Sequence, residues 1–80
     1  MIIDQNTHCY KTKVFRKAII GDYVVKLEAF GTQGAGFHPF VYSVMIVDKF
    51  GYRSLEGQFE TKAEAVACFK ETTAFYERFI

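Results

Sequence analysis

The alternation of hydrophobic and polar positions predicts two β-hairpins. Residues 12–20 and 23–30 have the composition of strands, and Gly21-Asp22 between them is a two-residue hairpin turn of the Gly-X type. Strands are also predicted over residues 40–47 and 52–59, joined by a type I turn that places Gly51 in the left-handed conformation. The glycine-rich segment 31–36 is predicted to be a loop. These elements form a four-stranded antiparallel sheet.

A helix follows the last strand. Thr61 and Glu64 form a capping box, in which the Thr61 hydroxyl accepts from the Glu64 N–H and the Glu64 carboxylate reaches back to the Thr61 N–H. The apolar positions at helical spacing are Ala65, Phe69, Thr72, Tyr76 and Phe79. We therefore expect one α+β domain over residues 1–80, with a C-terminal helix from Lys62 packed on one face of the sheet.

Turn lengths predict the strand register. In the first hairpin the core-facing pairs are predicted to be Ile20–Tyr23, Ala18–Val25, Arg16–Leu27 and Val14–Ala29. In the second hairpin they are Val47–Arg53, Met45–Leu55 and Val41–Phe59. This register assigns the helix to the face of Leu55 and Phe59, and it leaves uncovered the face that carries Phe40, Tyr42, Val44 and Ile46.

One helix covers one face of a four-stranded sheet, so the other face should display apolar side chains. The residues predicted to bind a protein there are Phe40, Tyr42, Val44, Ile46, Tyr52, Phe15 and Phe30. Three interpretations compete: a protein interface or homodimer seam, a stacking platform for single-stranded nucleic acid, or a core closed by residues 1–11 and the loop 31–36. The sequence favours the protein interface.

Composition and charge bear on the expected partners and cellular location of the chain. The formal net charge of +1 provides no strong overall attraction to nucleic acid or to anionic membranes. The chain has two cysteines without a C-x-x-C pattern, which predicts free thiols and a cytoplasmic location. The N-terminus lacks the basic and apolar regions of a signal peptide, and the apolar runs are too short to cross a membrane.

Candidate catalytic and metal-binding residues are sparse. His8, Cys9, His38 and Cys68 are the residue types of a zinc site, but their spacing fits no zinc motif. No residue is placed by the sequence to orient a Cys–His pair, and no oxyanion-hole motif is visible. We therefore expect a protein that is not an enzyme, with no metal, no cofactor and no small-molecule substrate.

Basic residues near the N-terminus support an alternative. A nucleic-acid-binding surface would use Lys11, Lys13, Lys17 and Lys26. The same lysines are also explained by an edge strand that is protected against aggregation.

Residues 52–65, followed by Cys68-Phe69 and Thr73-Ala74-Phe75, resemble the end of an AP2-type domain and the arm-binding domain of phage-type integrases. The shared motif is Phe-x-Thr-x-x-Glu-Ala at residues 59–65. The resemblance implies a sheet before a helix, and DNA recognition by the free sheet face. The matching positions are Ser54, Glu56, Gln58, Tyr42, Val44 and Ile46, so only the topology carries over.

In size and format the chain is also similar to small phage proteins, including anti-CRISPR inhibitors. This similarity implies a non-enzymatic cytosolic protein that blocks a host complex by surface contact.

Overall fold

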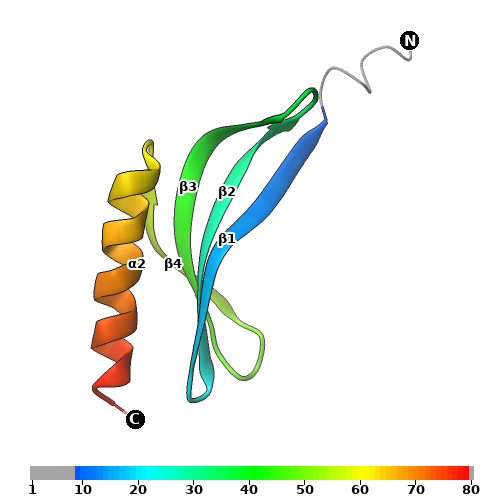
Figure 1. The fold of residues 1–80 in the computed structure, drawn as a ribbon. Coiled ribbons are helices and arrows are strands. Elements are labelled where there is room, and N and C mark those ends of the chain that lie inside the picture. Colours follow the sequence, from blue (N-terminus) through cyan, green and yellow to red (C-terminus); the bar gives the residue numbers. More distant parts are fainter. Residues whose placement is uncertain (1–8, 80) are drawn as a thin grey trace.

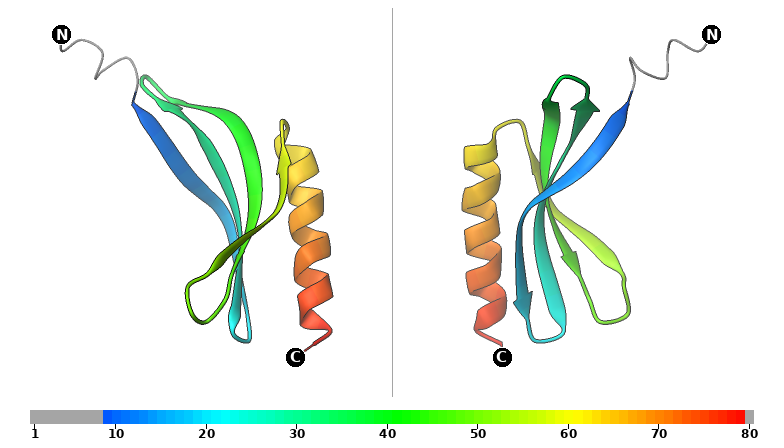
Figure 2. Two further views of the ribbon diagram at one scale, coloured as in Figure 1. Left: turned by 180° about the vertical axis from the view of Figure 1, so that it is seen from behind. Right: turned by 45° about the vertical axis from the view of Figure 1, so that its right-hand side comes forward.

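The computed structural model describes residues 9–79. Its strands are β1 (Tyr10–Ile20), β2 (Tyr23–Gln33), β3 (Phe37–Val47) and β4 (Arg53–Phe59), followed by the helix α2 (Lys62–Glu77). The strands form one antiparallel sheet in the order β1-β2-β3-β4, and α2 packs against one face of it (Figures 1 and 2). The predicted α+β fold is confirmed.

The two hairpin turns also follow the prediction. Gly21 and Gly51 have φ values of 60° and 89°, which a residue with a Cβ atom adopts only at a cost. The predicted loop 31–36 is shorter, because β2 continues to Gln33 and β3 begins at Phe37. Pro39 therefore lies inside a strand, where a bulge at the neighbouring Phe40 accommodates a residue that cannot donate to the ladder.

Three β-bulges determine which side chains share a face. One lies between Val14 and Arg16, one is at Phe40, and one leaves Glu56 unpaired. In the last of these, Met45 pairs with Leu55 and Val44 with Gly57. The extra residue interrupts the alternation along β4, so Leu55 and Phe59 lie on opposite faces.

The core lies between α2 and the face on which Phe59 lies. Its buried apolar residues are Ile20, Val25, Leu27, Ala29, Val44, Ile46, Ala65 and Phe69. Val44 and Ile46 are 0% and 4% exposed, so the prediction that they lie on the uncovered face is wrong. Tyr42 belongs to the helix-covered face as well, because it pairs with Phe59 and packs against this core. The predicted pairs Val41–Phe59 and Val14–Ala29 are each displaced by a bulge.

The start of α2 follows the predicted cap. The Thr61 hydroxyl accepts from the Glu64 N–H at 3.3 Å and donates to the Glu64 carboxylate at 2.9 Å. The Glu64 carboxylate therefore accepts from the Thr61 hydroxyl, whereas the sequence predicts that it accepts from the Thr61 backbone N–H. Ala65, Phe69 and Thr72 are buried as predicted, but Phe79 lies beyond the helix end and is 71% exposed.

The second face of the sheet, which we call the open face, has no helix or strand over it within residues 9–79 (Figure 1). One interpretation placed residues 1–11 and the loop 31–36 over the uncovered face. Residues 1–8 lie outside the described residues, whereas Tyr10 and Lys11 belong to β1 and residues 31–33 to β2.

Val44→Ala and Val14→Ala test which face forms the core. Val44 is completely buried whereas Val14, on the open face, is 50% exposed. Removing two buried methyl groups and leaving a cavity costs about 2 kcal/mol, so Val44→Ala should lower the free energy of unfolding by that amount. Val14→Ala should cost less than about 1 kcal/mol. Urea denaturation measures both, and equal losses would contradict the assignment.

Gly31 tests the close approach of β2 and β3. A Cβ atom at Gly31 would overlap the His38 carbonyl oxygen and lie 2.6 Å from the Cα atom of Pro39, whereas one at Gly34 meets no atom within 4 Å. Gly31→Ala should therefore destabilise the fold by about 3 kcal/mol, because backbone cannot give way as a flexible side chain does. Gly34→Ala should change stability by less than about 1 kcal/mol. Thermal denaturation measures both variants, and equal melting temperatures would contradict the close approach of β2 and β3 at Gly31.

Candidate functional site

The open face combines exposed apolar side chains from all four strands. Its apolar members are Tyr10, Val14, Ile19, Val24, Phe30, Phe40, Val41, Met45, Val47 and Leu55. Ile19 is 72% exposed, Phe40 55% and Leu55 52%. Side chains of this size, exposed together on a regular surface, are typical of an interaction site.

Three aromatic rings gather at one end of this face. Tyr10 stacks on Phe30 with ring centroids 5.7 Å apart and an interplanar angle of 7°. Phe40 meets both rings edge-on, each at a centroid distance of 6.4 Å. The bulge at Phe40 places this ring and Val41 on the same face, which makes the cluster larger than regular alternation allows. Rigid aromatic groups of this kind dominate the energetics of many protein interfaces.

An ion pair crosses the middle of the open face. Arg53 on β4 donates to the Glu28 carboxylate on β2 at 3.0 Å, so its side chain reaches over β3. Glu28 is only 8% exposed, while the Arg53 side chain is about half exposed. The prediction that Arg53 points toward the core is wrong, although its pairing with Val47 is confirmed. The pair neutralises a nearly buried carboxylate on this surface.

Of the residues predicted to bind a protein, Phe30 and Phe40 lie on the open face, and Tyr52 is exposed beside the β3–β4 turn. The others lie on the helix-covered face, where Phe15 contacts Tyr42 and where Val44 and Ile46 are core. The sequence assigns Val14 and Leu55 to the core face, yet both are exposed on the open face, and it does not include Ile19 among the binding residues although Ile19 faces away from the core. The missed signal for Leu55 was Gly57, because a glycine inside a strand often marks a bulge.

The four lysines of the nucleic-acid alternative do not form one surface. Lys17 and Lys26 pair with each other on the open face. Lys13 pairs with Ala29 and Lys11 with Gly31, which places both on the helix-covered side. The bulge between Val14 and Arg16 causes this division, since it reverses the alternation of β1 at its midpoint. β1 is an edge strand, as the second explanation of these lysines required.

A shallow hollow of about 240 Å³ lies between β4 and α2. It is lined by Glu56, Glu71, Thr72, Phe75 and Tyr76. Burial raises the pKa of the Tyr76 phenol, and the negative charge of Glu56 and the neighbouring Tyr23 add to the shift. The fold therefore favours the neutral phenol. Tyr76 is partly buried and packs against the core.

Metal-binding and redox groups are dispersed. Among residues 9–79, no three His, Cys, Asp or Glu side chains are grouped to hold a metal ion. Cys9 and Cys68 are free thiols, and the Cys68 Sγ lies 3.8 Å from the Thr72 hydroxyl. His8, one of the four residues considered for a zinc site, lies outside the described residues. In the same part of the chain, α2 is neither long nor apolar enough to cross a membrane.

Comparison with protein-family models, with curated proteins and with solved structures finds no match for this chain.

Arg53→Ala tests the ion pair on the open face. The substitution leaves a nearly buried carboxylate without its charged partner, which should lower the free energy of unfolding by about 1–3 kcal/mol. Lys49→Ala is the control, because it breaks the exposed pair with Asp22 at 3.9 Å and should cost less than about 0.5 kcal/mol. Urea denaturation at neutral pH compares the two, and an Arg53→Ala loss no larger than that of Lys49→Ala would contradict the assigned role.

Proposed function

We propose that this chain is a non-enzymatic protein-binding module that recognises its partner through the open face. One observation carries the proposal: a complete sheet face is uncovered in residues 9–79, and its apolar side chains are exposed at Ile19, Leu55 and Phe40. Burying them against a second protein gains hydrophobic free energy that the single helix does not provide. The partner is a protein, either a second copy of the chain or another polypeptide.

The size of the open face suits a protein interface. Three of its strands have 11 residues. With strands about 4.8 Å apart and a rise of about 3.3 Å per residue, the face measures about 19 by 35 Å, or roughly 700 Å² in projection. A standard protein–protein interface buries about 800 Å² on each partner. The face is thus large enough for specific association without any contribution from α2.

The composition of the open face also supports a protein partner. Its apolar and aromatic residues surround the Arg53–Glu28 ion pair, which neutralises the acidic group, and Lys17 and Lys26 lie among them. Aromatic anchors together with a smaller number of polar and charged groups are common in such interfaces. A small phage-type inhibitor, which the chain resembles in size and format, would block its target by surface contact of this kind.

Two matched substitutions test the proposal. Ile19 on the open face and Phe79 after α2 are 72% and 71% exposed, so a lysine at either position should leave the fold intact. Ile19→Lys should weaken association at least about tenfold, because it places a charge in a desolvated interface. Phe79→Lys should change association by less than about twofold.

Association is measured in two ways. Sedimentation velocity reports self-association, and pull-down from a lysate of the source organism followed by mass spectrometry reports a different partner. Circular dichroism confirms that both variants fold. A chain that stays monomeric and retains no protein contradicts the proposal, as does equal loss in the two variants.

A further inference from the structure

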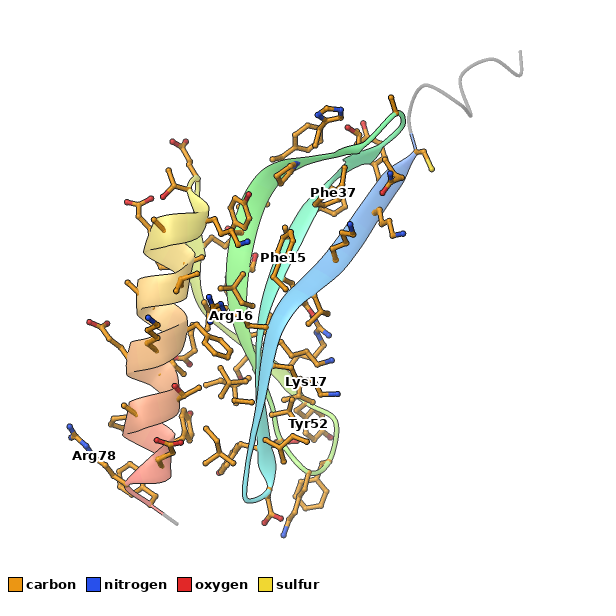
Figure 3. All side chains as sticks on the ribbon, in the orientation of Figure 1. Phe15, Arg16, Lys17, Phe37, Tyr52 and Arg78 are labelled. Atoms are coloured by element: carbon orange, nitrogen blue, oxygen red, sulfur yellow. The ribbon has the colours of Figure 1, made fainter. Side chains whose placement is uncertain are left out.

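The helix-covered face carries a second surface that the proposed function does not use. Its members, which we call the aromatic–lysine surface, are Phe15, Phe37, Tyr42, Lys13 and Lys62. It lies where the sheet extends past the first turn of α2, at the β2–β3 end, which all views show (Figures 1 and 2). Figure 3 shows Phe15 and Phe37 along this part of the sheet.

The β1 bulge creates this surface. Phe15 is the extra residue, so Phe15 and Arg16 both lie on the helix-covered side, and Figure 3 shows Arg16 pointing toward α2 and Lys17 away from it. The Phe15 ring lies 6.4 Å from that of Phe37 and 6.1 Å from that of Tyr42. Between β1 and β3, β2 contributes the small Ala29 and Gly31 on this side, and Gln33 opposite Phe37. The three rings thus form a continuous apolar floor across β1 and β3.

Cationic groups surround the rings. The Lys62 Nζ lies 4.6 Å from the Phe15 ring centroid, and the Lys13 Nζ lies 5.2 Å from the Phe37 centroid. Arg16 adjoins Phe15, and Lys11 lies two pairs beyond Lys13 toward the N-terminus, on the same face. The ion pairs within residues 9–79 are Lys49–Asp22 and Arg53–Glu28, so the positive charges of this surface remain available to a ligand.

From this arrangement we infer that the aromatic–lysine surface binds single-stranded nucleic acid. Unpaired bases offer flat π faces that stack on the aromatic rings, and each stacked base contributes about 1–3 kcal/mol. The phosphates between the bases match the surrounding ammonium and guanidinium groups. The carboxylates of an acidic peptide match the positive charge but provide no flat rings to stack on the aromatic side chains. The bases of a duplex are stacked on one another, so they are not available to these rings.

Fluorescence anisotropy with a labelled oligothymidylate of about ten nucleotides tests the inference. Four cationic contacts predict a slope of about −3 for the logarithm of the association constant against the logarithm of salt concentration. Lys13→Gln with Lys62→Gln removes two of the four contacts and should reduce the magnitude of that slope by about 1.5 and weaken binding. Lys17→Gln with Lys26→Gln removes the same charge from the open face and should change the slope by less than about 0.5.

A second pair of variants tests stacking separately from charge. Phe15→Leu keeps an apolar side chain beside Phe37 and Tyr42 but removes the ring, and it should weaken binding at least about fivefold. Phe15→Tyr keeps the ring and should bind within about twofold of the wild type. A duplex of the same length should bind at least about tenfold more weakly than the single strand.

Absence of binding at low salt overturns the inference. Equal weakening by the two lysine pairs overturns it as well, as does competition by polyglutamate or duplex as strong as that by the single strand. The result is independent of the protein-binding proposal, since Ile19→Lys on the opposite face should leave oligonucleotide affinity unchanged.

Discussion

The extra residue at Glu56 decides which face of the sheet α2 covers. The helix begins soon after Phe59, and the Thr61–Glu64 cap fixes its first turn. Because the connection is short, α2 packs on the face of the sheet that carries Phe59. Without the bulge, Leu55 and Phe59 would share that face. With it, Gly57 faces the helix, where its missing side chain leaves room for Cys68 and for the Phe59 ring. The core of Val44 and Ile46 follows from this one shift.

The sheet thus serves two surfaces of different chemistry. The helix side contains the packed core and, past the start of α2, aromatic rings with unpaired lysines. The open side contains aliphatic and aromatic groups around a neutralised carboxylate. Each surface depends on a bulge, because the irregularity at Phe15 brings a ring to the helix side and the one at Phe40 adds a ring to the open side. A chain with one helix has a small core, and the bulges bring additional side chains to the parts of both sheet faces that the helix does not cover.

Elements and turns were predictable from the sequence because local chemistry determines them. Gly21 and Gly51 supply positive φ, and Thr61 with Glu64 starts the helix. Strand pairing was predictable only as far as the first bulge from each turn: Arg16 pairs with Leu27 and Met45 with Leu55 as expected, and the pairs beyond them shift. In the second hairpin the predicted faces were wrong even where the pairs were right, because the bulge at Glu56 separates Leu55 from the face of Phe59. Since strand alternation has a period of two, one extra residue reverses every assignment that follows. Gly57 and Pro39 signalled two of the bulges, whereas nothing in the residues around Phe15 signals the third.

The solvent accessibility of methyl groups tests whether the Val44–Ile46 face is buried and the open face is exposed. Methyl NMR with a soluble paramagnetic gadolinium chelate, at a concentration where the chain is monomeric, measures it residue by residue. We expect strong relaxation enhancement at Ile19, Val14 and Leu55, and little at Val44, Ile46 and Leu27. Protection of Ile19, Val14 and Leu55 together with strong relaxation enhancement at Val44, Ile46 and Leu27 would show that the two faces are assigned the wrong way round. Protection of both groups would mean that the open face is covered.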